Sequence, residues 1–337
     1  MEQAVQRKSL KGRNRNLNPL VLFLFSILVI YVAIFTFVLV WALMNSFKPL
    51  AQWDAGQYMQ LPDYSNPLWT SKEMRYDMKG NEVISTYYPN IFANYTKVIE
   101  AMPGVGNARY YAGWKLNNPM TTEYQNTIFT MVFNTIFYSL VGSFIIAVVP
   151  CVVGYLAAKY PYKFSSLLYF LTLFVMVMPL VGTEPARVKL LQRLYLFDTM
   201  WGDFIVNFTF ANMYFLVFYA FYSGVSGTFA EAAEVDGASQ LRTMIQIIMP
   251  LASKMILTVV LIFFIGRWNN YATPLVYMPN KWMISYRLYI ITIYQDKVGG
   301  DPAKIAGAMI IVLPILIIFI LLRNKIMGNV SMGGIKE

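Results

Sequence analysis

Residues 128–157 read IFTMVFNTIFYSLVGSFIIAVVPCVVGYLA, and they lie inside 35 consecutive residues, 124–158, that carry no charged side chain. A helix rising about 1.5 Å per residue needs about 20 apolar residues to cross a bilayer core about 30 Å thick. The chain repeats this pattern, with further charge-free runs of 32, 20, 27 and 18 residues. A chain of 337 residues with 57% apolar and 13% charged side chains is therefore predicted to be an all-α polytopic membrane protein.

The charge-free runs predict six transmembrane helices. Five basic residues precede the first run, and only Lys48 follows it within the next twenty positions, so the positive-inside rule places the N-terminus in the cytoplasm. Six crossings return the C-terminus to the same side. The predicted spans are residues 19–46, 128–157, 164–183, 203–223, 254–275 and 304–322.

This topology divides the chain into embedded and water-exposed parts. The segment after the first span holds seven basic and seven acidic residues between Lys48 and Gln125, together with turn-forming sequences, so it is predicted to be an enlarged extracellular cap rather than a linker. The predicted parts are a cytoplasmic segment at 1–18, the first span at 19–46, the cap at 47–127, a transmembrane core at 128–323 with a cytoplasmic loop at 224–252, and a cytoplasmic tail at 324–337.

The composition excludes several kinds of chemistry. The chain has no His and one Cys, Cys151, which rules out a His-based catalytic site, a disulfide within the chain and a multi-thiolate metal site. The net charge of +10 is scattered among apolar spans, which argues against a nucleic acid partner. The charge-free runs hold no carboxylate for a coupling ion, and the absence of any Gly-Lys pair excludes a phosphate-binding loop. Energy for uphill transport would have to come from a separate ATPase.

The predicted loop at 224–252 contains a short helix that another protein could engage. Thr228 and Glu231 have the spacing of a capping box, and Gly237 is placed to end the helix about two turns later in a left-handed conformation. Ala232 and Ala233 give this helix a low-profile face that a groove in a partner could approach closely.

Uncharged polar and aromatic residues in the spans are candidates for a substrate pathway. Amides bond sugar hydroxyls and aromatic faces pack against pyranose CH groups, so such a lining suits a neutral sugar. Asn in a membrane helix also bonds neighbouring helices, which is the alternative role for each amide. Arg267 is expected to snorkel to the outer interface, with substrate binding as the alternative role. The candidate pathway residues are Asn134, Tyr138, Asn207, Asn212, Tyr214, Trp268, Asn269, Asn270 and Tyr271.

The order Glu231-Ala232-Ala233, Gly237, Ile247 and Pro250 resembles the EAA loop of importer permeases in the ABC-transporter superfamily, with Met249 where Leu is usual. Segments 154–160, 194–199, 264–275 and 332–337 resemble elements of carbohydrate ABC transporter permeases, the MalG-like group of binding-protein-dependent transport system inner membrane components. The resemblance covers roughly residues 15–50 and 85–337, and residues 51–84 look like an insertion.

The resemblance implies a type I ABC importer transmembrane domain in a bacterial plasma membrane, forming half of the pathway for a sugar or oligosaccharide. It implies no ATPase site in this chain, because two cytoplasmic ABC ATPase subunits would bind ATP and Mg²⁺. The other implied partners are a second homologous permease subunit and an extracytoplasmic solute-binding protein. By this resemblance residues 228–240 form the coupling helix, and the ATPase-coupling residues are Glu231, Ala232, Ala233, Gly237, Ala238, Ile247 and Pro250.

Two other functions stay open on sequence. A permease for a peptide, a polyamine or another non-sugar solute would share the EAA loop. A membrane receptor without transport activity could bind a ligand with the outer cap, but that reading would leave the EAA loop unexplained.

Overall fold

The computed structural model describes residues 19–65, 72–76, 82–86, 91–106, 124–160, 162–178, 182–294 and 300–327. The predicted segment 1–18, and the tail from 328 onward with its resemblance at 332–337, lie outside these residues. The chain separates into two units, Met1–Asn94 and Tyr95–Glu337, each described by itself. The division falls inside the predicted cap at 47–127, which is therefore shared between the units.

The first unit contains the first predicted span. Helix α2 (Pro19–Ser46) reproduces the predicted bounds, because its 28 residues carry no charge that would end it earlier. The chain turns after α2, where the Asn94 side-chain amide donates to the carbonyls of Ser46 and Lys48, at 2.9 and 2.8 Å. The buried Lys48 ammonium donates to the Gln57 carbonyl at 2.6 Å, and burial lowers the pKa of Lys48. The unit also holds α3 (Leu50–Asp54) and an antiparallel hairpin of β1 (Lys72–Tyr76) and β2 (Glu82–Thr86).

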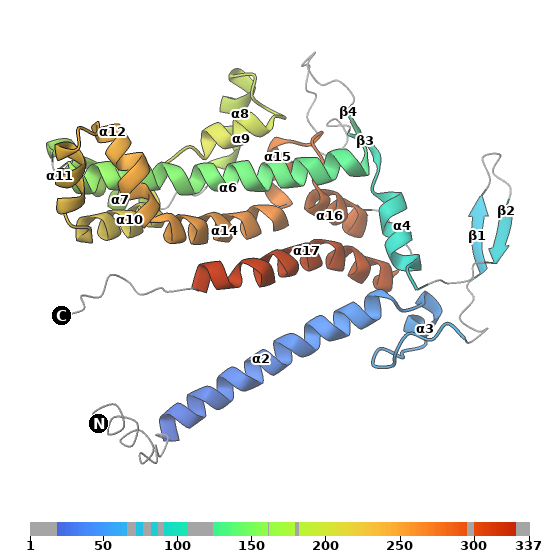
Figure 1. Ribbon diagram of the computed structural model, residues 1–337. Helices are drawn as coiled ribbons and strands as arrows, with labels where there is room; N and C mark the ends of the chain where they lie inside the picture. Colours follow the sequence, from blue (N-terminus) through green and yellow to red (C-terminus); the bar gives the residue numbers. More distant parts are fainter. Residues whose placement is uncertain are drawn as a thin grey trace. The chain divides into compact units, whose positions relative to one another are not determined.

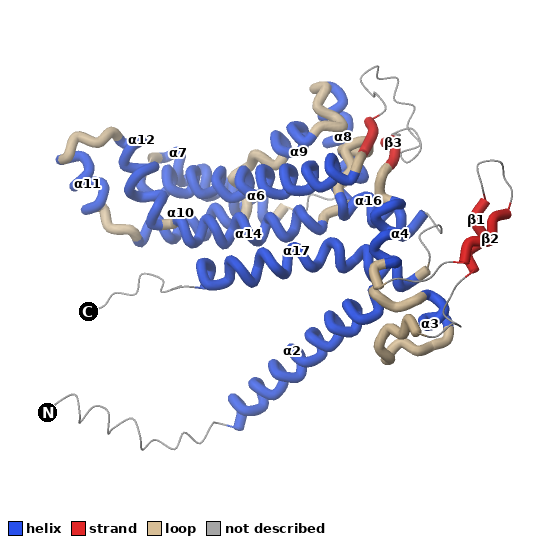
Figure 2. Tube along the Cα trace, turned by 45° about the vertical axis from the view of Figure 1, so that its right-hand side comes forward, coloured by secondary structure: helices blue, strands red, loops and turns tan. Residues whose placement is uncertain are grey.

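The second unit is built around α6 (Ile128–Lys159), with α10 (Met213–Gly224) and α14 (Ser253–Asn269) packed along it (Figures 1 and 2). Thr127 begins α6 with a capping box, since its hydroxyl accepts from the Thr130 N–H while the Thr130 hydroxyl accepts from the Thr127 N–H. Gly154 allows α10 to approach α6, because a β-carbon there would lie 3.1 Å from the Tyr219 nitrogen.

Further elements complete this unit. They include a second hairpin, so the chain is mostly helical and not all-helical as predicted. The remaining elements are α4 (Ala93–Ala101, which begins in the first unit), β3 (Gly104–Gly106), β4 (Tyr124–Asn126), α7 (Lys163–Val177), α8 (Glu184–Arg193), α9 (Met200–Val206), α11 (Thr228–Val235), α12 (Gln240–Thr243), the π-helix η2 (Met244–Ile248), α13 (Met249–Leu251), α15 (Ala272–Tyr277), α16 (Ile284–Tyr294) and α17 (Asp301–Met327).

Two apolar clusters hold the second unit together. The first cluster packs α16 and the loop before it against the N-terminal half of α6, and the second packs α10, η2 and α14 against its C-terminal half. Buried members of the first cluster include Met131, Tyr138, Trp282, Met283, Tyr286 and Ile291. Buried members of the second include Cys151, Tyr155, Phe218, Tyr222, Ile248 and Ala252.

The structure confirms long apolar helices at three predicted spans and corrects the helix bounds of the other three. In the described part of the chain, α2, α6 and α17 are long and apolar enough to cross a membrane, and two bent helix pairs raise the number to five if each pair is one crossing. Predicted span 164–183 is shortened to α7, which ends at Val177. Met178 directly precedes Pro179, and a residue before proline disfavours helical geometry; Met178 has an extended ψ of 123°.

The prediction of continuous helices at 203–223 and 254–275 is wrong. The first is interrupted between α9 and α10, where the Asn212 side chain accepts from the N–H groups of Tyr214 and Phe215 and so starts a new helix. The second is interrupted after α14, where the Asn270 side chain accepts from the Thr273 N–H. Asn side chains compete in this way with helical backbone hydrogen bonds, and a hydropathy profile does not detect this competition.

Candidate functional site

The candidate coupling site is α11 with the segment that joins it to α14. The expected capping box between Thr228 and Glu231 is wrong, because the helix is capped by Gly227, whose carbonyl accepts from the N–H groups of Ala230 and Glu231. Thr228 is the first helical residue, and its N–H donates to the Ser226 hydroxyl at 3.3 Å. Glu231 is exposed in the first turn, where a carboxylate is favoured by the helix dipole.

The end of α11 agrees with the sequence prediction. Gly237 has a φ of +74°, the left-handed conformation that favours glycine. Its N–H donates to the Glu234 carbonyl at 3.0 Å, and the Ala238 N–H donates to the Ala233 carbonyl at 2.9 Å. These two bonds form a Schellman motif, which stops the helix after two turns.

The two alanines of the loop face different ways. Ala232 is exposed, whereas Ala233 is buried, so one of them packs inside the loop and only the other is available to a partner. Larger apolar side chains are also exposed here. Phe229 is 47% exposed, Val235 89% and Leu241 63%. The loop therefore presents an apolar surface with Glu231 on the same helix.

A bent connector joins α11 to α14. It begins at α12, where the Ser239 side chain accepts from the Arg242 N–H, and continues through η2 and α13. The π-helical turn ends two residues before Pro250, which lacks an N–H and whose ring crowds the preceding helical turn. The connector meets α14 at an angle of 73° beside the buried Ala252. Ile247 is half-buried against the second cluster, so it anchors the connector to the helices.

A polar cavity of about 430 Å³ lies between α11, the connector and the end of α6. Glu231 and Glu234 line it from α11, and Lys159 lines it from α6. The Lys159 ammonium donates to the Val225 carbonyl, which fixes the end of α10 against α6. Glu231 and Glu234 are both exposed, so their carboxylates are accessible from water at this end of the helices.

Three of the predicted pathway residues are buried inside this chain. The Asn134 side-chain amide donates to the Trp282 carbonyl at 3.1 Å, and the Trp268 indole donates to the Ile311 carbonyl at 3.1 Å. Tyr138 is buried with its ring 4.1 Å from the Arg267 guanidinium carbon. Each of these side chains contributes to packing inside the chain.

The other predicted pathway residues are partly or fully exposed. Asn269 and Tyr271 are the exposed ones, and the Tyr271 ring stacks on Tyr289 with ring centres 4.1 Å apart. Half-exposed Asn207, Asn212, Tyr214 and Asn270 have local partners in Asp203, the start of α10, Phe263 and Thr273. The structure brings Asn269, Asn270 and Tyr271 together at the break between α14 and α15.

Arg267 does not snorkel to an interface, which corrects the sequence expectation. Its guanidinium is buried in an ion pair with the carboxylate of Asp203 on α9, and its Nε donates to the Tyr138 carbonyl at 3.3 Å. The Asn207 side chain donates to the same carboxylate at 3.0 Å. Gly142 on α6 leaves room for this pair, since a β-carbon there would lie 2.2 Å from the Arg267 Nε. A single buried pair thus ties α6, α9 and α14 together.

Asp198 also has a structural role, which its sequence pattern does not predict. It has a φ of +61°, and its carboxylate accepts from the N–H and the side-chain amide of Asn280, at 3.0 and 2.9 Å. The signal in the sequence was its place within the matched segment 194–199.

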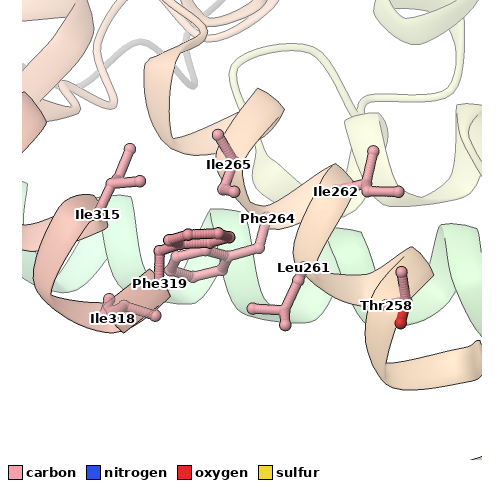
Figure 3. A pocket seen from close by; sticks show the side chains of 8 residues that line it. All are labelled: Thr258, Leu261, Ile262, Phe264, Ile265, Ile315, Ile318 and Phe319. Carbon is pink, nitrogen blue, oxygen red and sulfur yellow. The ribbon is translucent and has the colours of Figure 1, made fainter. Parts of the chain in front are cut away.

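An apolar groove of about 110 Å³ between α14 and α17 is unsuited to a sugar (Figure 3). Thr258 carries the one hydroxyl among its described lining residues, and that hydroxyl already donates to the Lys254 carbonyl at 2.9 Å. The side chains that line it are Thr258, Leu261, Ile262, Phe264, Ile265, Ile315, Ile318 and Phe319.

Comparison with known proteins finds relatives among transport-system permeases. The arabinooligosaccharides transport system permease protein AraQ of Bacillus subtilis is 23% identical over 62% of this chain and 74% of its own length. The diacetylchitobiose uptake system permease protein NgcG of Streptomyces coelicolor is 23% identical over 65% and 74%. The trehalose transport system permease protein SugB of Mycobacterium tuberculosis is 24% identical over 60% and 75%.

A solved structure and a family match agree with these relatives. A bacterial ABC transporter involved in the import of the acidic polysaccharide alginate shares the fold with a TM-score of 0.55, at 18% identity over 91% of this chain and 98% of that one. Residues 150–326, which are 177 of the 337 residues, match the family described as binding-protein-dependent transport system inner membrane component. The chain therefore belongs to that family of multi-pass permease subunits of bacterial ABC importers, and within it resembles the permeases for carbohydrates.

Proposed function

We propose that this chain is the transmembrane permease subunit of an ATP-driven ABC importer for a neutral sugar or oligosaccharide, and that it couples to a separate ATPase through α11. The observation that carries the coupling role is the exposed, firmly terminated α11 helix. It combines Glu231 with apolar side chains such as Val235, which is 89% exposed. Exposed apolar patches mark surfaces that bind a protein, a membrane or a ligand, and the exposed Glu231 carboxylate on the same helix favours a protein.

The proposed topology has six crossings, made by α2, α6, α7, α10, α14 and α17, with both termini in the cytoplasm. Helices α7 and α10 have 15 and 12 residues, about 22 and 18 Å, which is short for a crossing. The segment with α8 and α9 lies between them in the sequence, and in this proposal it completes the membrane depth on the outer side. The excess of basic residues before α2 supports this orientation.

Movement of α11 would reach the helices through the connector. A partner ATPase that binds ATP and Mg²⁺ would close around α11 and displace it, as in other transitions in which packed elements move as rigid bodies. The connector is helical from Gln240 to Leu251, and Ile248 is buried in the second cluster with residues of α6 and α10. Displacement of α11 would therefore tilt α14 and α10 and not be absorbed by a loose loop.

The substrate class is supported by the relatives and by the break after α14. The relatives are named for arabinooligosaccharides, diacetylchitobiose and trehalose, all carbohydrates. Asn269 and Tyr271 offer an exposed amide and an aromatic ring, a combination that suits sugar hydroxyls and CH groups. A second homologous permease and an extracytoplasmic solute-binding protein complete the proposed importer.

The proposal is tested by purifying the chain with the subunits encoded beside it and measuring uptake. We expect an ATPase to co-purify, and we expect Glu231→Ala to abolish uptake while the protein still inserts into the membrane. Glu234→Ala, one turn later on α11, is the matched control and should retain uptake. Recovery of the complex without an ATPase, or normal uptake by Glu231→Ala, would contradict the coupling role.

A further inference from the structure

A second, larger cavity of about 820 Å³ lies at the same end of α6 as α11. The C-terminal end of α6, the beginning of α7 and the connector helix α12 form its walls, together with Phe210 from the segment before α10. Its size falls in the range of ligand-binding cavities, about 300–1,000 Å³. None of the predicted sugar-pathway residues lines it. It adjoins the coupling surface, because Leu241 belongs to both and Gln240 also lines the polar cavity.

The lining of this cavity has an apolar part and a polar part. Apolar side chains include Val152, Leu156, Leu168 and Phe210. Hydroxyl and amide groups are supplied by tyrosines such as Tyr162 and by Gln240. Tyrosine favours the boundary between hydrocarbon and water, because its ring is apolar and its hydroxyl is polar. The ligand that matches both parts is an amphiphile.

Two basic residues are neighbours of the lining residues in the sequence. Lys163 is exposed between the lining residues Tyr162 and Phe164, and Arg242 is exposed between Leu241 and Met244. None of the lining residues that the structure describes is acidic. Glu231 and Glu234 line the neighbouring polar cavity instead. Basic residues at a membrane surface attract anionic lipids by about 1 kcal/mol each.

We propose that this cavity binds an anionic phospholipid, with an acyl chain against Leu156 and Phe210 and the headgroup beside Lys163 and Arg242. The proposal relies on the proposed function only for placing this end of α6 in the cytoplasmic leaflet. Because α12 forms one wall and also belongs to the connector between α11 and α14, a bound lipid would stabilise one position of the connector. Lipid composition would then affect coupling.

The test measures lipid retention by native mass spectrometry on the purified full-length chain, alone or with its partners. The probes are palmitoyl-oleoyl phosphatidylglycerol and the matching phosphatidylcholine, added after delipidation. We expect the wild type to retain phosphatidylglycerol preferentially. The double variant Lys163→Gln, Arg242→Gln should bind phosphatidylglycerol roughly 30-fold more weakly, because two basic residues that each contribute about 1 kcal/mol are lost. Both residues are exposed, so this variant should fold normally.

A cavity-filling variant tests the acyl site. Leu156→Trp should lower retention of both lipids, whereas Leu173→Trp, at an exposed position of α7 outside the cavity, should not. Equal retention of both lipids by the wild type, or unchanged phosphatidylglycerol binding by the Gln double variant, would overturn the proposal. A photo-crosslinker at Leu156 that captures protein instead of lipid would also overturn it. None of these readouts requires transport, so failure of the importer proposal would be seen separately.

Discussion

Replacing Asp203 by Ala leaves the guanidinium of Arg267 buried without its carboxylate partner. In the native protein that guanidinium pairs with Asp203, donates to the Tyr138 carbonyl and lies over the Tyr138 ring. The variant keeps the last two contacts and loses the ion pair. Arg267→Ala makes the converse change, because it leaves the Asp203 carboxylate with Asn207 as its remaining side-chain donor among the described residues.

The expected cost is large because both groups are shielded from water. Their side chains are 8% and 4% exposed, and removing one partner of a buried pair typically costs about 3–5 kcal/mol. For a folded unit of this size, each kcal/mol corresponds to about 2–4 °C in melting temperature. Each single variant should therefore melt about 6–20 °C below the wild type. Asp203→Leu combined with Arg267→Met should recover most of that loss, since no charge is left buried.

The assay is thermal denaturation in detergent followed by fluorescence-detected size-exclusion chromatography. Lys304→Ala is the matched control, because Lys304 pairs with Asp301 at 3.5 Å while the two side chains are 41% and 61% exposed. An exposed pair contributes about 0–1 kcal/mol, so this control should melt within about 4 °C of the wild type. If Asp203→Ala melts no lower than the control, or if the apolar double variant is as unstable as the single variants, the reasoning about the buried pair is refuted.

The remaining predictions use the same melting assay, with uptake where stated. Gly142→Ala should lower the melting temperature as much as breaking the ion pair does, because its β-carbon would lie 2.2 Å from the Arg267 Nε. Gly266→Ala, with nothing within 4 Å of its β-carbon, should leave the melting temperature unchanged. Equal melting temperatures for the two variants would contradict the close approach of Gly142 and Arg267. Asn134→Ala should lower the melting temperature, whereas Asn269→Ala should leave it unchanged and raise the KM for sugar; a stable Asn134→Ala with impaired uptake would reverse these roles. Trp268→Phe should cost about 1 kcal/mol through its lost hydrogen bond, and no change would show that the bond is dispensable.

The long spans could be predicted from sequence because a single physical requirement sets them. Helices α2 and α6 match their predicted starts and end within two residues of their predicted ends, since a charge-free apolar run of bilayer length has few alternatives in a membrane. The interruptions at Asn212 and Asn270 could not be predicted from the same runs. They depend on side-chain bonds to local N–H groups, which do not change the hydropathy of the segment.

The local structure of the α11 helix was predicted in part. Gly237 was placed correctly because a helix stop needs a left-handed residue, and glycine adopts it without strain. The start was misplaced because Thr228 was assigned as the cap, whereas Gly227 occupies that position and Thr228 bonds to Ser226 instead. The pairing of Asp203 with Arg267 joins residues 64 positions apart, and no local pattern in the sequence indicates it.

The central claim is that this chain moves a sugar only when an ATPase acts on α11. The most direct measurement is uptake of a panel of radiolabelled neutral oligosaccharides by proteoliposomes that contain the chain, its partner subunits and the solute-binding protein, with and without internal ATP, for the wild type and Glu231→Ala. The account predicts uptake of at least one sugar that requires ATP and is lost in Glu231→Ala while the complex still hydrolyses or binds ATP. Uptake that proceeds equally without ATP, or that is unchanged in Glu231→Ala, would contradict it.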